Sequence, residues 1–237
     1  MAMKKSTEKS ISFLKRTATE VIKYRTRMKI LTVLLVLLTT FTGVIYVAAA
    51  LYEQTGSFTV SIDKTEMLKY GLSLSETRDM DRPTSSLNAK ISEQMTNIAG
   101  EDIDANVDMI DGVHNGRDYI AYTFYVQNAG TVEVAYEYQV NLSGVTQSLD
   151  EALRLRLYVD GEATTYAKTK SDGTGAEPNT TEFYSANVIA KQRIDGFEPG
   201  EMTRFTVVIW IEGNDPDCID WLIGGELRVD MLMSIVY

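Results

Sequence analysis

The sequence predicts an all-β fold, an antiparallel two-sheet sandwich with one helical excursion, preceded by a single N-terminal transmembrane helix. Two observations predict this architecture. The first is one long uncharged apolar run near the N-terminus. The second is a series of segments after it in which apolar and polar residues alternate, joined by turn-rich links and without the strand–helix–strand rhythm of a parallel sheet.

The apolar run extends from Ile30 to Ala50 and holds 21 residues without a charged side chain. As a helix rising about 1.5 Å per residue, it would cover the roughly 30 Å of a bilayer's hydrocarbon core. Twelve of its residues are Leu, Ile, Val or Phe. On an insertion scale they favour insertion by roughly 4 to 7 kcal/mol. We therefore expect a basic leader at 1–29, a lipid-contacting segment at 30–52 and an extracytoplasmic domain at 53–237.

Charge predicts the orientation of this segment. Residues 1–29 hold nine basic side chains against two acidic ones, which leaves 14 basic and 31 acidic side chains of the chain's 23 and 33 for the rest. By the positive-inside rule the N-terminus stays in the cytoplasm and the acidic domain lies outside the cell. The same acidity excludes nucleic acid as a partner, because a phosphate binder needs clustered Lys and Arg.

The sequence leaves open whether the helix is retained. Ala48, Ala49 and Ala50 form an A-x-A arrangement of the kind that a signal peptidase cuts, but the apolar run is longer than that of a usual signal peptide. A retained helix makes the protein a single-pass membrane protein. Cleavage near Ala50 makes it a secreted one.

Period-two alternation predicts about nine strands. The first, Phe58, Val60 and Ile62 with polar residues between them, begins only a few residues after the apolar run. In Leu153 to Asp160 the leucines are expected to point inward and Arg154 and Arg156 outward. The other predicted strands are 68–74, 119–126, 132–142, 163–168, 183–189, 205–211 and 227–235.

The segment between the second and third strands differs in pattern. Leu87, Ile91, Met95 and Ile98 recur at helical spacing, which predicts one helix that begins near Ser85 or Ser86 and ends at Gly100.

An acidic stretch follows this predicted helix. Alternating oxygen ligands can wrap a hard cation, so a calcium site is one interpretation, although the glycine and the twelfth-position glutamate of an EF-hand are missing. A solvated acidic loop is the other interpretation, with no cofactor. The candidate ligands are Asp102, Asp104, Asn106 and Asp108.

Few residues offer catalytic chemistry, so we expect no enzyme. His114 is the single histidine and lies in a turn-like segment, which excludes multi-histidine metal sites. Cys218 is the single cysteine, and its acidic neighbours disfavour a thiolate, so a buried structural thiol is expected. Trp210 and Trp221 either stack sugars on an exposed face or cover the rim of a core.

Two segments resemble a known family. FYVQNAGTVEVAYEYQVNL, within residues 119–143, resembles the strand, Asn-x-Gly-Thr turn and alternating strand of the TasA and camelysin family of bacterial surface and biofilm-matrix proteins. FEPGEMTRFTVVIWIEG, within residues 197–236, is similar to that family's Pro-Gly turn and following strand. The resemblance implies a jelly-roll-like sandwich, export and a structural role. The family's link to metal-dependent proteolysis is not carried over, because no zinc-ligand motif is present.

These observations favour a non-enzymatic bacterial surface or matrix protein whose domain contacts other surface proteins or copies of itself. The alternative is a membrane-anchored domain that binds carbohydrate or calcium. If the chain is cut after Ala50, the freed strand with Phe58, Val60 and Ile62 on one face is expected to add to a neighbour's sheet edge and form filaments. A retained helix disfavours such polymerisation.

Overall fold

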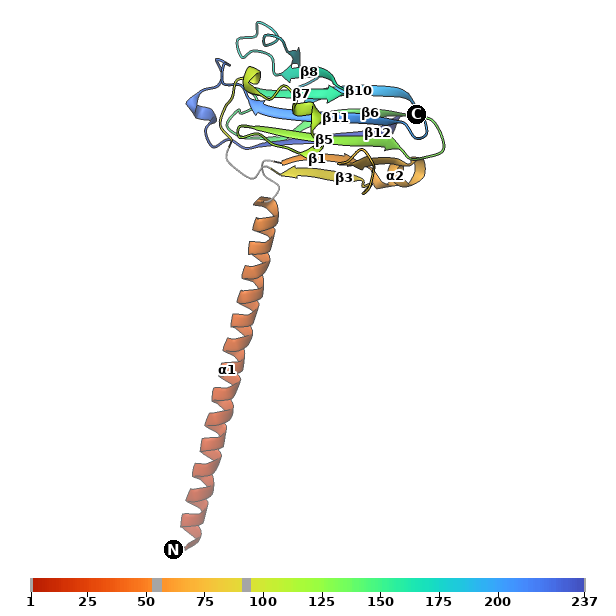
Figure 1. Ribbon diagram of the computed structural model, residues 1–237. Helices are drawn as coiled ribbons and strands as arrows, with labels where there is room; N and C mark the ends of the chain where they lie inside the picture. Colours follow the sequence, from red (N-terminus) through yellow and green to blue (C-terminus); the bar gives the residue numbers. More distant parts are fainter. Residues whose placement is uncertain (1, 53–56, 91–94, 237) are drawn as a thin grey trace. The chain divides into compact units, whose positions relative to one another are not determined.

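A computed structural model describes residues 2–52, 57–90 and 95–236. Two units compose the chain, one up to Gln54 and the other from Thr55. The first is a single helix, α1 (Ala2–Tyr52), so the leader and the apolar run form one continuous element (Figure 1). Its segment Val21–Tyr46 has the length and composition of a candidate membrane span or signal anchor, and its residues are exposed.

The second unit is mostly β and contains two sheets. One sheet has the strand order β10-β6-β12-β1-β3, and the other has the order β2-β5-β11-β7-β8-β9, with the short β4 also paired to β5. The strands are β1 (Ser57–Ile62), β2 (Leu72–Ser75), β3 (Ser86–Lys90), β4 (Gly112–Val113), β5 (Tyr119–Asn128), β6 (Val134–Val145), β7 (Leu153–Val159), β8 (Glu162–Ala167), β9 (Thr181–Glu182), β10 (Val188–Phe197), β11 (Met202–Ile211) and β12 (Leu227–Val236).

Both sheets are mixed, which corrects the expectation of purely antiparallel ones. β1 runs parallel to β12, with Phe58 opposite Val229, and β8 runs parallel to β9. The remaining strand pairs are antiparallel. Alternation shows that a segment is a strand but does not identify its neighbour, so the parallel pairing of the first and last strands left no sequence signal.

One hydrophobic core lies between the sheets. Phe205 of β11 stacks on Phe124 of β5, with ring centroids 5.4 Å apart, and meets the ring of Tyr138 on β6 edge to face at 5.3 Å. Phe58 of β1 contacts Tyr122 of β5 in the same way at 6.1 Å. Residues from both sheets therefore bury their inward faces against each other.

A smaller core covers the outer face of the second sheet. The residues of β11 that point away from the main core include Val208 and Trp210, and they pack against Ile103 and Val107. Those two residues belong to the segment between β3 and β4, which carries the short 3₁₀ helices η1 (Gly100–Asp102) and η2 (Val107–Met109). The acidic stretch is thus fixed to the sheet by its apolar residues.

The prediction of a helix near residues 85–100 is wrong. Ser86–Lys90 is strand β3, paired with β1, and Ile98 forms an isolated bridge with Glu212. Ile91 lies outside the described residues. Among the described residues of the β unit, an α-helix occurs instead at α2 (Lys64–Tyr70). Asp63 caps it by accepting the backbone N–H of Thr65, and it ends at Gly71, which has a left-handed conformation.

Two other boundaries differ from expectation. The predicted strand at 68–74 begins only at Leu72, because α2 occupies the residues before it. The predicted strand at 183–189 is wrong, since β9 ends at Glu182 and β10 begins at Val188. β10 lacks regular alternation and shows two register shifts against β6, so the period-two pattern missed it.

Candidate functional site

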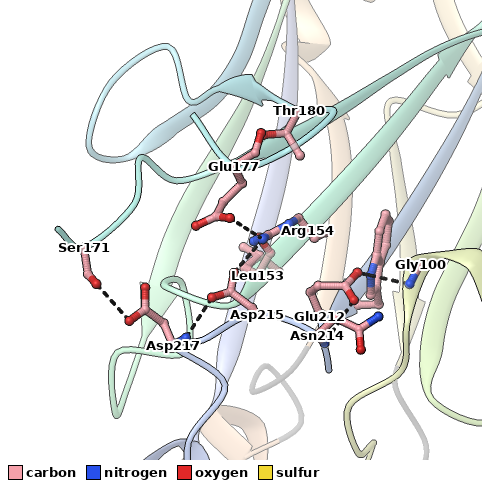
Figure 2. A network of polar contacts seen from close by, with 11 residues as sticks. Gly100, Leu153, Arg154, Ser171, Glu177, Thr180, Glu212, Asn214, Asp215 and Asp217 are labelled. Carbon is pink, nitrogen blue, oxygen red and sulfur yellow. Dashed lines mark hydrogen bonds and ion pairs between the residues drawn. The ribbon is translucent and has the colours of Figure 1, made fainter. Parts of the chain in front are cut away.

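A buried ion cluster lies at one end of the second sheet, where β7 begins and β11 ends (Figure 2). One Nη of Arg154 lies 2.5 Å from an Oδ of Asp215 and 3.6 Å from an Oε of Glu177. The other Nη donates to the backbone oxygen of Leu153 at 3.1 Å. The side chains of Arg154, Asp215 and Glu177 are only 5%, 0% and 7% exposed. Three charged groups are therefore removed from water together.

Two loops place the acidic side chains beside Arg154. Asp215 follows β11, and its other carboxylate oxygen accepts the backbone N–H of Asp217 at 2.8 Å, which closes the turn locally. Glu177 comes from the loop after β8, where its backbone oxygen accepts the N–H and the hydroxyl of Thr180. Arg154 points away from the main core, as predicted, but these loops cover it. Its expected exposure is therefore wrong.

The electrostatics of the cluster are unbalanced, because two acids share one guanidinium. The pKa of Glu177 is raised, first by its burial and then by the nearby charge of Asp215, while Arg154 acts in the opposite direction. Carboxylate oxygens of Glu177, Asp215 and Asp217 lie within 4.8 Å of one another, as metal ligands would. The guanidinium that already binds two of them would repel a divalent cation, so the geometry favours an ion pair.

A cleft of about 580 Å³ opens beside the cluster, and its wall includes Arg156, Lys170 and Trp210. The indole N–H of Trp210 donates to Glu212 at 2.9 Å, and the same carboxylate oxygen accepts the backbone N–H of Gly100 at 3.0 Å. The guanidinium carbon of Arg156 lies 5.1 Å from the indole centroid. Trp210 is only 2% exposed, so its ring is a covered part of the wall and not a sugar-stacking platform.

The four predicted calcium ligands take different roles. Asp102, Asp104 and Asn106 are exposed, and Asp104 accepts the backbone N–H of Asn106 at 2.9 Å. Asp108 is buried and lies 3.2 Å from an Nη of Arg204. Among the described acids, histidine and cysteine, the cluster with metal-ligand spacing contains none of these residues. Calcium binding here stays a prediction.

His114, the single histidine, holds the acidic segment in place. One ring nitrogen lies 2.6 Å from the backbone oxygen of Val107 and the other lies 2.8 Å from that of Gly112. Each ring nitrogen therefore faces a backbone oxygen of this segment.

The predicted assembly residues lie inside the β unit. Phe58 and Val60 are fully buried and Ile62 is 4% exposed. Their strand pairs with β12 on one side and β3 on the other. In this structure the three residues form part of the hydrophobic core. Their role in assembly stays a prediction, and it requires β1 to leave its sheet.

Sequence reasoning missed the ion cluster. Arg154 and Arg156 share one face of β7, and alternation does not distinguish which of them a loop will bury. Asp215 was noted only as an acidic neighbour of Cys218, and nothing in that segment indicates contact with Arg154, 61 residues earlier.

Cys218 is half-buried beside this cluster, and its Sγ accepts a hydrogen bond from the Asn97 amide at 3.4 Å. Burial raises the pKa of the thiol, and the charges of Asp215 and Glu212 add to the effect. A raised pKa leaves less thiolate at pH 7.5, so we expect Cys218 to react with maleimide more slowly than free cysteine. Stopped-flow labelling of the folded and urea-unfolded protein measures this, and an equal or faster rate in the folded protein would contradict it.

Comparisons with known proteins identify no family. No family model and no curated protein match the chain. Among solved structures, a GH31 alpha-xylosidase from Xanthomonas citri shares 9% identity over 73% of this chain and 13% of its own, with a TM-score of 0.24. A beta-glucosidase from Kluyveromyces marxianus in complex with glucose shares 11% identity. The match covers 76% of this chain and 17% of the beta-glucosidase, with a TM-score of 0.23. The chain thus spans under a fifth of these proteins, and likeness at this level defines neither fold nor activity.

Proposed function

We propose that the chain is a non-enzymatic, membrane-anchored bacterial surface protein whose β unit, a jelly-roll-like sandwich of the TasA and camelysin type, contacts other proteins. The exposure of the apolar side chains of α1 is the observation that supports a membrane anchor. Its large apolar side chains from Ile30 to Tyr46 are 51% to 77% exposed. Such a surface is stable only when lipid or another apolar partner covers it.

Charge supports the orientation. Nine basic side chains precede Ile30, and the remainder of the chain is strongly acidic. Cytoplasmic anionic lipid attracts the leader, while the acidic β unit remains soluble on the outside.

A binding role is supported by how the polar groups of the β unit are used. The carboxylates of Asp215 and Glu177 are engaged by the Arg154 guanidinium, and each ring nitrogen of His114 faces a backbone oxygen. Catalysis needs a group that is free to exchange a proton or attack a substrate, which these arrangements disfavour.

The sheet edges offer the contact surface. β3 ends one sheet, and among the described residues no strand pairs with its outer edge. An extended segment of a partner or of a second copy can add there through backbone hydrogen bonds. β10, at the opposite edge, has two register shifts and carries Lys191 and Arg193, features that protect an edge from pairing. We therefore place the contact at β3.

A photo-crosslinking amino acid at Asn88, an exposed residue of β3, tests this contact in cells that express the full chain. The matched control carries the same group at Lys191 on β10. We expect a discrete protein adduct, either with another protein or with a second copy, from position 88 and not from position 191. Equal adducts at both positions, or none at either, would contradict contact at β3.

A second candidate function is carbohydrate binding in the cleft beside Trp210. Its wall places Arg156, Lys170, Asn179 and Thr180 around a volume of about 580 Å³, and such groups can bind sugar hydroxyls. A glycan array probed with the full chain tests it. Binding that Lys170→Ala and Asn179→Ala abolish would favour this candidate over protein contact.

A further inference from the structure

An ordered loop between β11 and β12 presents three large apolar side chains to solvent. Ile219, Trp221 and Ile223 are 59%, 71% and 76% exposed, whereas Leu222 between them is only 8% exposed and fastens the loop to the β unit. Isolated exposed apolar residues are common on protein surfaces. Three within five positions of one short loop are a concentrated apolar surface, which we call the apolar loop.

Hydrogen bonds hold the backbone of the apolar loop in one conformation, and this conformation exposes the three side chains. The 3₁₀ helix η3 (Asp220–Leu222) forms its centre, and the N–H of Gly225 donates to the oxygen of Leu222 at 2.9 Å. With its amide oriented to donate, the Gln147 side chain also reaches the backbone oxygens of Trp221 and Ile223 at 2.8 and 2.6 Å. The fold therefore holds these side chains outward.

Strand topology places the apolar loop at the end of the sheet where the chain arrives from α1. The loop leads directly into β12, and β12 is parallel to β1 with Phe58 opposite Val229. The first residues of both strands consequently share one end of the sheet. Only four residues separate Ser57, the first residue of β1, from Tyr52, the last of α1. At most about 3.6 Å per residue is available to that connection, so it is short.

We propose that the apolar loop inserts into the headgroup region of the bilayer that α1 anchors, and that Trp221 is its central contact. Tryptophan is enriched at the membrane–water interface, because an amphipathic ring suits the headgroup level. This inference rests on the proposed membrane anchor.

The charge of the loop selects the lipid. Residues 213–225 contain Asp215, Asp217 and Asp220 and no basic residue. Asp215 is paired with Arg154 inside the β unit, so the charges that anionic headgroups would repel are those of Asp217 and Asp220, and salt would screen the repulsion. The loop is therefore built for a zwitterionic or weakly charged surface and binds by apolar contact.

Tryptophan fluorescence of the full chain in phosphatidylcholine vesicles tests the proposal. The chain has two tryptophans, and Trp221→Phe leaves only the buried Trp210, so the difference between the two proteins reports Trp221 alone. We expect quenching of Trp221 by a phosphatidylcholine that carries a nitroxide near its headgroup, and a several-fold lower iodide quenching constant than in detergent. Trp210 should show neither effect.

Matched variants separate the loop from exposed apolar residues in general. Ile219→Ser with Ile223→Ser should remove most of the lipid quenching of Trp221. Val132→Ser removes an apolar side chain that is 54% exposed near the start of β6, at the opposite end of the sheet, and should leave the quenching unchanged. Adding phosphatidylglycerol should weaken the quenching at low salt and not at high salt.

The outcomes distinguish this inference from the anchor on which it rests. Protein that fails to float with the vesicles overturns the anchor itself. Protein that floats while Trp221 remains open to iodide and untouched by the nitroxide lipid overturns the loop contact alone. Shielding of Trp221 that grows with the protein-to-lipid ratio, without lipid quenching, means that a second copy covers the loop, and this result also overturns the proposal.

Discussion

Replacing Arg154 with methionine is expected to lower the free energy of unfolding of the β unit by about 3–5 kcal/mol, because it leaves two buried acids without a partner. Asp215 and Glu177 are 0% and 7% exposed at their side chains and bind the same guanidinium nitrogen. Urea unfolding of the detergent-solubilised full chain, followed by near-ultraviolet circular dichroism, measures the change.

Two comparisons isolate the cause of this loss. Arg117→Met removes an arginine whose side chain is 92% exposed, and should change the stability by no more than about 0.5 kcal/mol. Adding Asp215→Asn and Glu177→Gln to Arg154→Met removes the uncompensated charges and should recover a large part of the loss. A loss from Arg154→Met as small as that from Arg117→Met would show that the cluster is not a buried ion pair.

Truncating Phe205 to alanine is expected to cost about 3–5 kcal/mol, the range for removing a buried aromatic ring. Its ring contacts Phe124 in its own sheet and Tyr138 in the other, so the cavity would lie between the two sheets. The same urea experiment measures the loss, and we expect all spectroscopic probes to shift to lower urea together.

The control for Phe205 is Tyr184→Ala, which truncates an aromatic side chain that is 66% exposed. Its effect should stay within about 0.5 kcal/mol. If Phe205→Ala cost no more than this control, or if two separate transitions appeared, the sheets would not share one cooperative core.

Much of the β unit follows from alternation alone. β6 is the clearest example, because its residues from Val134 to Leu142 are alternately buried and half-buried, as a strand with one face on a core requires. β5, β7, β11 and β12 were also predicted near their observed positions, since each carries a long apolar face. The alternation of apolar and polar residues identifies a strand wherever one face of that strand packs on the core and the other does not.

Errors arose where local pattern had two readings. Leu87, Met95 and Ile98 fit a helical face, but β3 pairs with β1 and buries Ala89, a residue too small to mark a strand by alternation. β10 has an irregular burial pattern because its pairing with β6 shifts register twice.

The ion cluster and the apolar loop depend on tertiary structure. Arg154, Glu177 and Asp215 meet only because two loops fold over the start of β7. Trp221 was expected either to stack sugars or to cover the rim of the core, and only the fold shows that Leu222 takes the inward position while Trp221 is 71% exposed.

The most direct test of the account is the side of the membrane on which the β unit lies. In a Cys218→Ser background, the single cysteine is placed either by Ala176→Cys, on an exposed loop of the β unit, or by Ser6→Cys, in the basic leader. Intact cells are then treated with a membrane-impermeant maleimide. With the β unit outside the cell, we expect labelling at position 176 in intact cells, and at position 6 only after the membrane is opened. Labelling at position 6 in intact cells, or protection of position 176 until lysis, would contradict it.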